Sequence, residues 1–565
     1  MGSWIEYTQS KWRDLDMEKL TRDEAYLKVI SNVDSPMWLY SLSADCYLCP
    51  FTQVKKIGPH ETKHVKINVA TKNSFEVYDR DVGTYAFNNE TAYCKDIRSS
   101  LGEFGVYNMT IYPDKVCSIV TDKTPVNTLL PIVLIALLVI ALVAFANAFV
   151  FMREKYFRTR RDPNEESDET VAPTTRRLSS LDTVRGIAIV LMIFVNGGGG
   201  GYHWIEHAPW NGLHFADIVF PFFMWIMGVC IPISTKSQLN RNIAKKSILY
   251  NILVRSIKLF LIGVFLNSVS GPNLETLRIM GVLQRFGICY FLAASVHTIF
   301  SKHHDILPQA LVKRSLYDIF VMIPQWIFAW TLVVVHLVIT FGLPVPGCPK
   351  GYLGPGGKHE MGAYNACIGG ATGYIDDAIL GNHIYQHPTA KYIYDSKAFD
   401  PEGIFGCLLS TVHVIIGVQC GMTLTTFTQW TSRVLRWSIW GLVLGLVGGA
   451  LCQFSKEDGL IPVNKNLWSL SFVFVTSSLA FFLLVVCYYL IDVKSHWSGA
   501  PLRHCGMNAI IMYIGHSALH KMLPWHWRIG LMNTHFILLL ECTWNTILWV
   551  FIAIYLHHKK IFYTV

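Results

Sequence analysis

The stretch LDTVRGIAIVLMIFVNGGGGGYHWIEHAPWNGLHFADIVFPFF, residues 181–223, decides the fold. Two apolar segments flank a short connection that begins with a glycine run at residues 197–201. Asp182 and Arg185 open the first segment, and Asp217 lies at the start of the second. Ionisable groups at bilayer depth are costly, so they usually face a cavity or a partner and mark a functional site. The stretch therefore predicts chemistry inside a membrane protein.

The composition of the whole chain agrees with this interpretation. Apolar residues make up 52% of the 565 residues and charged residues only 15%, which is too apolar for an ordinary soluble protein. We expect an all-α polytopic membrane protein with about eleven transmembrane helices. The predicted spans lie near residues 126–152, 182–198, 213–234, 247–269, 279–300, 317–342, 403–426, 434–452, 467–491, 505–521 and 536–557.

The net charge of +9 does not indicate nucleic-acid binding. Much of the basic charge lies in short connections between predicted spans, where it reports orientation. The basic residues concerned are Arg153, Lys155, Arg158, Arg160, Arg161, Arg176, Arg177, Lys236, Arg241, Lys245, Lys246, Lys302, Lys313, Arg314, Arg433, Arg436, Lys559 and Lys560. All fall on one side of the membrane, so we expect a lumenal N-terminal region, a cytosolic C-terminus and a lumenal connection at residues 203–211.

Residues 1–123 form a separate, small β-rich unit. The alternating stretches HVKINVA (64–70) and FGVYNMTIY (104–112) predict half-buried strands. Two glycosylation sequons begin at Asn89 and Asn108. Together with four cysteines they favour an oxidising compartment and two disulfides of undetermined pairing, over a metal site or free thiols; the four are Cys46, Cys49, Cys94 and Cys117.

The rest of the chain divides by composition. We expect a first transmembrane helix over residues 124–152, a cytosolic linker over 153–180 and a multi-pass domain over 181–565. A Gly- and Pro-rich lumenal loop at 343–400 holds Cys348 and Cys367, which we expect to pair. The opening MGSWIEYTQSKWRD has no apolar leader. Either the chain is a processed form, or the first span inserts with its N-terminus translocated.

His207 is the first catalytic candidate. An imidazole can accept and return a proton near neutral pH, or attack an acyl group itself. An isolated histidine at this depth would more often be an interfacial residue satisfied by water. Here Asn196 offers an amide that can hold an oxyanion, and Asp217 offers a carboxylate that can orient the imidazole. The glycine run allows close backbone approach, or is simply a turn.

Further polar residues occur on predicted spans. Arg185 either pairs with Asp182 or binds an anion, and RIMGVLQR raises the same question for Arg278, Gln284 and Arg285. The stretches VNKNLWSLSF and GMNAIIMYIGH add Asn464, Asn466, Asn508 and His516, each more often a packing residue than a catalyst. The chain contains no P-loop, HExxH or GxSxG motif, and nothing in it demands a metal.

Several motifs in a fixed order resemble the heparan-α-glucosaminide N-acetyltransferase family, a family of lysosomal membrane enzymes. The resemblance runs from about residue 178 to the C-terminus, and more loosely over the N-terminal unit. Its motifs include LDTVRG, the glycine run, HAPWNGLHFADIVFPFF, RIMGVLQRFG, LPVPGCPKGYLGPGG, GGATGYIDDAILG, FDPEGIFG, IPVNKNLWSLSF and GMNAIIMYIGH. The chain departs from the family pattern at Pro209, where relatives carry serine, and at Gly197, where an aromatic residue can precede the glycines.

The resemblance implies a reaction. Cytosolic acetyl-CoA would donate an acetyl group to the amine of the terminal non-reducing glucosamine of heparan sulfate in the lysosome lumen. The family's active-site histidine corresponds to His207 and its asparagine to Asn196, and we add Asp217 as the orienting carboxylate. We place on acetyl-CoA the residues Arg185, Trp210, Asn211, Arg278, Gln284 and Arg285.

Two chemistries and two other classes of protein stay open. His207 acts as general base for direct transfer, or is itself acetylated and passes the group on. A multi-pass transporter of a small anionic or sugar substrate is the alternative function, and a scaffold that binds through its lumenal unit is a third. Acetyl-CoA, the glucosamine terminus and membrane lipid are the implied partners, with a homodimer as one alternative for the oligomeric state.

Overall fold

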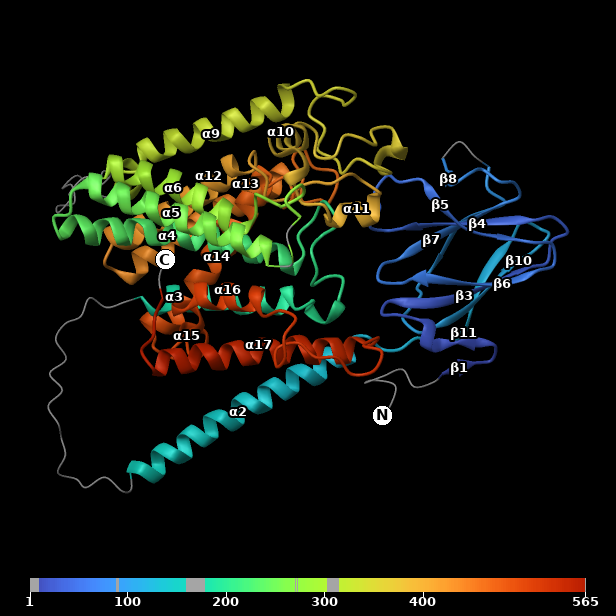
Figure 1. The fold of residues 1–565 in the computed structure, drawn as a ribbon, viewed down its shortest axis with the longest axis horizontal. Helices are drawn as coiled ribbons and strands as arrows, with labels where there is room; N and C mark the ends of the chain where they lie inside the picture. The colour runs from blue at the N-terminus through green and yellow to red at the C-terminus, as the bar shows by residue number, and fades with distance from the viewer. Residues whose placement is uncertain are drawn as a thin grey trace.

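A β-rich region and a helix bundle follow one another along the chain (Figure 1). The computed structural model describes residues 10–87, 91–158, 178–269, 271, 273–301 and 315–563. Most of the predicted linker, the sequon at Asn89 and the basic residues Lys302, Lys313 and Arg314 lie outside the described residues.

The β-rich region is a two-sheet sandwich. One sheet has the strand order β11-β10-β3-β6 and the other β8-β5-β4-β7-β9, while β1 and β2 form a short hairpin. The strands are β1 Lys11–Trp12, β2 Leu15–Asp16, β3 Glu24–Ser31, β4 Met37–Ser43, β5 Phe51–Ile57, β6 Thr62–Asn68, β7 Asn73–Tyr78, β8 Tyr85–Ala86, β9 Cys94–Ser99, β10 Val106–Ile111 and β11 Cys117–Lys123. Both predicted strands are confirmed, as β6 and β10.

Inward-facing residues of the two sheets form one core. Leu27 and Met109 from the first sheet pack with Leu39 and Phe75 from the second, and all four are fully buried. The predicted oxidised state of the four cysteines is confirmed, since the disulfides are Cys46–Cys49 and Cys94–Cys117. Burial of these side chains and the two disulfides together stabilise the sandwich.

The remaining chain is helical. Its α-helices are α2 Leu130–Arg158, α3 Ser179–Asn196, α4 Val219–Asn240, α5 Lys245–Ser268, α6 Val282–Phe300, α8 Tyr317–Phe320, α9 Ile323–Gly342, α10 Ala371–Leu380, α11 Thr389–Tyr394, α12 Cys407–Thr426, α13 Trp430–Leu451, α14 Leu470–Tyr488, α15 Leu502–Met507, α16 Ala509–Ala518 and α17 His535–His558. Two short 3₁₀ segments, η2 (Gly199–Gly201) and η3 (Phe215–Ile218), lie between α3 and α4.

The fold class expected from the sequence is confirmed, with one correction to the spans. Within the described residues, nine helical segments are long and apolar enough to cross a membrane, and each coincides with a predicted span. The predicted first span is α2, a helix of 29 residues. The span predicted over 505–521 is instead broken at Asn508, where the backbone leaves helical geometry between α15 and α16. The apolar composition of residues 505–521 gives no indication of this break in the helix.

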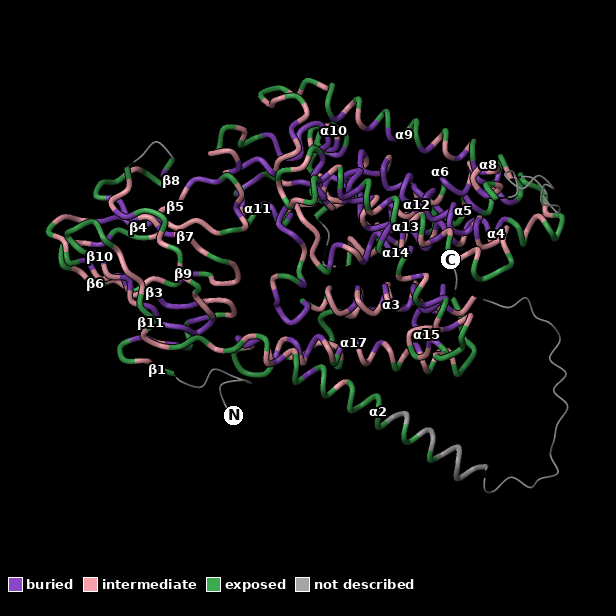
Figure 2. Tube along the Cα trace, turned by 180° about the vertical axis from the view of Figure 1, so that it is seen from behind, coloured by how far each residue is buried: buried purple, intermediate pink, exposed green. Residues whose placement is uncertain are grey.

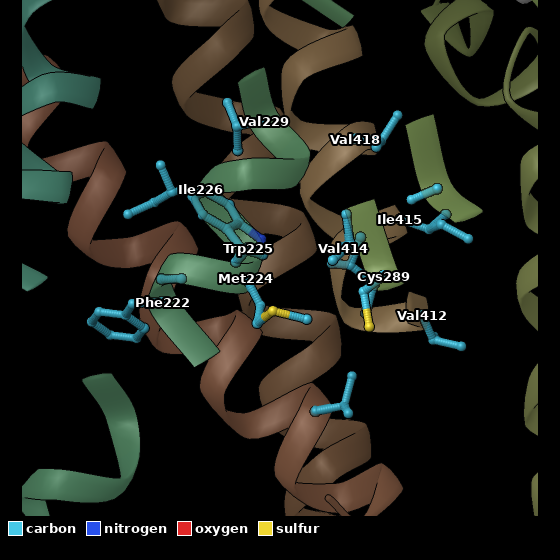
Figure 3. Close-up of a cluster of buried hydrophobic side chains, with 14 of the residues drawn as sticks. Phe222, Met224, Trp225, Ile226, Val229, Cys289, Val412, Val414, Ile415 and Val418 are labelled. Carbon is cyan, nitrogen blue, oxygen red and sulfur yellow. The ribbon is translucent and has the colours of Figure 1, made fainter. Parts of the chain in front are cut away.

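Helix α12 is the centre of the bundle. The buried share of its apolar window is 83%, against 28% for α5, α9 and α13, which lie at the rim. Figure 2 shows the same contrast: buried residues fill the middle of the bundle, and α2 lies exposed at its edge. Glycines let α12 and α4 touch, because a Cβ added at Gly417 would lie 2.1 Å from the carbonyl oxygen of Trp225. Figure 3 shows the side chains of both helices meeting around Trp225.

One end of the bundle carries the β-rich region, and we call it the domain end. A shared apolar cluster joins the two parts there: Cys46 and Cys49 of the sandwich pack with Trp210, Phe399 and Tyr394 of the helical part. The loop at 343–400 also lies at this end, and its predicted disulfide Cys348–Cys367 is confirmed. The opposite end carries the α4–α5 connection, α15 and the C-terminus (Figure 1).

Candidate active site

The glycine run is a left-handed loop that the rest of the molecule packs against. All of residues 198–201 have positive φ, between 55° and 98°, a conformation that glycine adopts without a Cβ penalty. A Cβ at Gly201 would lie 2.2 Å from Arg22 of the sandwich, and one at Gly200 would lie 2.8 Å from Leu539 of α17. The carbonyl oxygen of Gly200 lies 2.9 Å from His535 Nδ1. The glycines therefore permit contact between protein segments.

His207 and Asp217 form the central pair of the site. His207 Nδ1 lies 2.7 Å from Asp217 Oδ1, and the Asp217 side chain is 1% exposed while that of His207 is 41% exposed. The other carboxylate oxygen accepts hydrogen bonds from the backbone N–H groups of Ala208 and His214, at 3.1 and 3.0 Å. Asp217 lies in η3, so one short turn holds the carboxylate still. The pair keeps Nε2 of an exposed imidazole available as a base or nucleophile.

Lys465 is the third member of the site. Its Nζ lies 3.3 Å from His207 Nδ1 and 3.4 Å from Nε2. The lysine comes from the connection between α13 and α14, 258 residues further along the chain. From the stretch VNKN only the two asparagines were predicted as candidate polar residues of the spans. The position of a lysine next to a predicted span is the feature that could have indicated Lys465.

Asn211 and Asn464 fix this connection to the His207 loop. Asn464, which is fully buried, donates from Nδ2 to Asn211 Oδ1 at 3.0 Å, and Asn211 donates to Glu457 Oε2 at 2.7 Å. Burial raises the pKa of the Glu457 carboxyl. A backbone hydrogen bond of 2.8 Å from Gly212 to Val463 closes the junction. Asn211 therefore positions the loop that holds Lys465.

Two more histidines surround the site. The rings of His203 and His214 meet edge to face at 5.0 Å. His203 Nε2 lies 3.2 Å from the Asp45 carboxylate of the sandwich, and that hydrogen bond raises the pKa of the His203 imidazole. Burial lowers the pKa of His214. The sandwich therefore contributes a charged group to the wall of the site.

A cavity of about 340 Å³ lies between α3, α4, α5, α6 and α16. On α3 it is lined by Arg185, Ile189 and Met192, which share one helix face. Asn196 follows Met192 by four residues, so it continues this face about 6 Å towards the domain end. There Asn196 Nδ2 lies 3.0 Å from Nε2 of His516, which is 4% exposed on α16.

A series of aromatic contacts links the wall of the cavity to the neighbourhood of the His207 site. Phe223 and Phe286 line the cavity, and their rings lie 6.4 Å apart. Phe286 contacts Phe220 at 5.6 Å, and Phe220 meets Trp468 edge to face at 5.0 Å. The backbone N–H of Trp468 donates to the carbonyl oxygen of Lys465 at 3.1 Å. A chain of contacts thus connects the cavity wall with the connection that carries Lys465.

Comparison with known proteins decides the family. Residues 177–313 match the family model described as heparan-alpha-glucosaminide N-acetyltransferase, catalytic. The chain is 36% identical to the mouse heparan-alpha-glucosaminide N-acetyltransferase and 38% identical to the human one. Each alignment covers 98% of this chain and 90% of the relative. The chain belongs to the heparan-α-glucosaminide N-acetyltransferase family. The matched catalytic segment contains His207, Asn196 and Asp217, whereas Lys465 lies outside it.

The predicted acetyl-CoA residues separate into two groups in this N-acetyltransferase family member. Arg185 lines the cavity and donates to Asp182 Oδ1 at 3.1 Å and to the Gly506 carbonyl oxygen at 3.3 Å. Trp210 is buried, donates to the Leu353 carbonyl oxygen at 2.8 Å and packs on Phe399 at the domain end. Of these residues, therefore, only Arg185 is at the cavity.

Arg278, Gln284 and Arg285 belong to the domain-end half of the bundle. Arg278 Nη2 lies 2.5 Å from carboxylate oxygens of both Asp400 and Glu402, and these carboxylates raise the pKa of its guanidinium further. Gln284 is buried and donates to the Ile279 carbonyl oxygen at 3.0 Å. Arg285 is buried, lies 5.3 Å over the Trp468 ring and donates to the Gly403 carbonyl oxygen at 2.7 Å.

Arg255 is a cavity residue that sequence reasoning missed. It lines the cavity from α5, and its guanidinium lies 4.8 Å over the ring of Tyr290. In the part of the chain that the structure describes, no carboxylate makes an ion pair with it. The presence of an arginine within an apolar span is the feature that could have indicated it.

Among the described residues, no group of three or more His, Cys, Asp or Glu side chains is arranged to hold a metal ion.

Proposed function

We propose that the protein transfers the acetyl group of acetyl-CoA across the membrane to the amine of a terminal, non-reducing glucosamine of heparan sulfate. The relatives' names give the acceptor class and the reaction. The observation that carries the proposal is the exposed His207 imidazole held by the buried Asp217 carboxylate at 2.7 Å. Such a pair can take a proton from an ammonium group or attack a thioester.

The domain end faces the lysosome lumen in this proposal, and the opposite end faces the cytosol. Three disulfides lie at the domain end or in the sandwich, as an oxidising compartment favours. Basic residues of the α4–α5 connection, among them Arg241 and Lys245, lie at the opposite end, as cytosolic loops do. The N-terminal sandwich is then lumenal and the C-terminus cytosolic.

Acetyl-CoA enters the cavity from the opposite end. Its phosphates meet Arg185 and Arg255, while the apolar walls around Met192 and Phe223 accept the rest of the arm. The thioester end of the donor then passes Asn196, whose amide lies 3.0 Å from His516 Nε2, and reaches His207. Arg278, Trp210 and Asn211 hold the domain end together instead of contacting the donor.

Two routes fit the His207 site. In the direct route Nε2 removes the proton of the glucosamine ammonium while the amine attacks the thioester carbon. In the double-displacement route Nε2 itself attacks, coenzyme A leaves, and the amine then takes the acetyl group from the imidazole. Asp217 stabilises the imidazolium in the first route and orients the ring in both. Asn196 donates to the developing oxyanion if its amide rotates away from His516.

The test is acetyl transfer by purified protein in detergent or liposomes, with wild type against His207→Ala. Wild type should release coenzyme A only when glucosamine is present, or once per site without it, and His207→Ala should lose about 10³-fold or more in kcat. Binding of acetyl-CoA should be unchanged. A wild-type protein that releases no coenzyme A but moves a solute across liposomes would be a transporter and would end the proposal.

A further inference from the structure

We propose that Lys465 is a catalytic residue whose ammonium group stabilises the negative charge on the acetyl carbonyl oxygen during transfer. This inference rests on the proposed acetyl transfer and adds to it a second, charged donor for the oxyanion beside the Asn196 amide. The Lys465 Nζ atom lies 3.4 Å from His207 Nε2, the atom that reacts or carries the reacting proton. No other cation of the described residues lies within hydrogen-bonding distance of this imidazole.

The position of Nζ leaves the reacting lone pair open. Its distances to Nδ1 and Nε2 are nearly equal, at 3.3 and 3.4 Å. An atom lying along the Nε2 lone pair would be much closer to Nε2 than to Nδ1. The ammonium therefore lies beside the ring and does not occupy the direction of the Nε2 lone pair, along which a carbonyl carbon or an amine would approach. Since Nδ1 donates to Asp217, the lone pair is on Nε2.

Lys465 interacts with the Asp217 and Glu402 carboxylates at a longer range than an ion pair. Among the described residues no acidic oxygen lies within 4 Å of Nζ, although Arg278 on the same side of the site is held by two carboxylates. A lysine without an ion pair, next to a half-exposed imidazole, keeps its charge for a ligand or a transition state. The backbone that carries Lys465 is also held in place, because the preceding Asn464 is fully buried and bonded to Asn211 and to the backbone of Leu467.

The chemistry needs a donor at this position. The attacking nitrogen, from the imidazole or from the amine, forms a bond to the thioester carbon, and the π electron pair of the carbonyl moves to oxygen. The resulting tetrahedral oxyanion lies beside Nε2, where an ammonium at about 2.7–3.1 Å can donate to it. Collapse re-forms the C=O bond and breaks the C–S bond, and the thiolate of coenzyme A leaves. The lysine keeps its proton throughout.

The alternative role for Lys465 is an anchor for the carboxylate or sulfate groups of the polymer. The two roles differ in which acceptors need the lysine. An oxyanion donor is required with every amine acceptor, including glucosamine itself, which bears no anionic group. An anchor is required only by acceptors that carry a uronate or a sulfate.

The experiment compares Lys465→Met with wild type in single-turnover coenzyme A release, using glucosamine and a uronate-bearing glucosamine disaccharide. We expect kcat to fall about 10²–10³-fold with both acceptors, while acetyl-CoA binding is unchanged. Lys456→Met is the matched control, since Lys456 is in the same connection and pairs with Glu457 at 3.9 Å; its kcat should stay within threefold of wild type.

Two further measurements keep the outcome decisive. Lys465→Arg should retain more than a tenth of kcat, and ethylammonium should restore part of the activity of Lys465→Ala, which no purely structural role predicts. A wild-type rate in Lys465→Met, a loss confined to the uronate-bearing acceptor, or absence of rescue by both arginine and ethylammonium would overturn the inference. Failure of the wild type itself to transfer acetyl would instead overturn the proposed function.

Discussion

The two ends of the helix bundle use their charges differently. At the domain end most ionisable side chains have a partner: His207 has Asp217, His203 has Asp45, and Arg278 has Asp400 and Glu402, while Lys465 contacts the His207 ring. At the opposite end Arg185 is paired with Asp182, whereas Arg255 lines the same apolar cavity over the Tyr290 ring and makes no ion pair with a carboxylate of the described residues. Paired charges hold backbone segments in place, whereas a cation without an ion pair can interact with an anionic ligand. The comparison assigns chemistry to one end and capture of the donor to the other.

The largest expected effect comes from the paired end. Asp217→Asn should lower kcat by about 10²–10⁴-fold, because the amide no longer stabilises an imidazolium and can favour the wrong imidazole tautomer. The KM for acetyl-CoA should change less than twofold, since Asp217 does not line the cavity. Steady-state coenzyme A release checks both values.

The matched control is the other carboxylate–histidine pair of the same loop. Asp45→Asn removes the carboxylate that holds His203 at 3.2 Å and should leave kcat within threefold of wild type. Equal losses in the two variants would mean that charge pairing at this end serves only folding, and the assignment of chemistry to His207 would fail.

This contrast also explains what the sequence could and could not predict. His207 and Asp217 are only ten residues apart in the sequence, so their pairing could be predicted from this short separation. The oxidised state of the N-terminal cysteines, the Cys348–Cys367 disulfide and nine of the spans followed from composition and spacing, whereas the pairing of the four N-terminal cysteines did not. The role of Lys465 could not be predicted from the sequence, because Lys465 reaches His207 only through the packing of the α13–α14 connection against the His207 loop.

The assignment of the arginines shows the same limit. In the sequence, Arg278 is a charged residue on an apolar segment. This position is equally compatible with binding phosphate and with pairing to carboxylates. Asp400 and Glu402, which neutralise it, lie 122 and 124 residues away in the chain. Arg255 presents the same signal without such partners, and the difference exists only in the tertiary structure. The partners of a charge, more than its presence on a span, decide its role.

The second prediction concerns the unpaired cation at the opposite end. Arg255→Ala should raise the KM for acetyl-CoA about tenfold and leave kcat unchanged, because a cation that meets phosphates contributes to binding in the ground state and the transition state alike. Acetyl-pantetheine, which has no nucleotide or diphosphate, should be used equally well by the variant and the wild type. Kinetics with the two donors measure this directly.

Lys258→Ala on the same helix is the control for Arg255. Its side chain is exposed and does not line the cavity, so the KM for acetyl-CoA should stay within twofold of wild type. If Arg255→Ala lowered kcat with acetyl-pantetheine as well, the cavity would not be a separate capture site, and the division between the two ends would not hold.

The smallest effect is expected where the sandwich meets the bundle. Glu103 is 4% exposed, its Oε1 accepts from the Asp23 backbone N–H at 3.3 Å, and its Oε2 lies 3.7 Å from His535 on α17. Burial raises the pKa of this carboxyl to about 7, from 4.5. Because the folded-state pKa is raised, the associated stability is fully present below pH 4.5 and is lost as the pH rises through about 7.

The β-rich region should therefore be held more firmly at the acidic pH of a lysosome than at neutral pH. Between pH 5 and pH 8 we expect wild type to lose on the order of 2–3 kcal/mol of unfolding free energy through this group. Glu103→Gln, which stays neutral, should reduce that difference, whereas Glu18→Gln at an exposed position of the same region should leave it intact. Thermal unfolding of the three proteins at both pH values is the measurement. An unchanged pH dependence in Glu103→Gln would show that the pH-sensitive group is not Glu103.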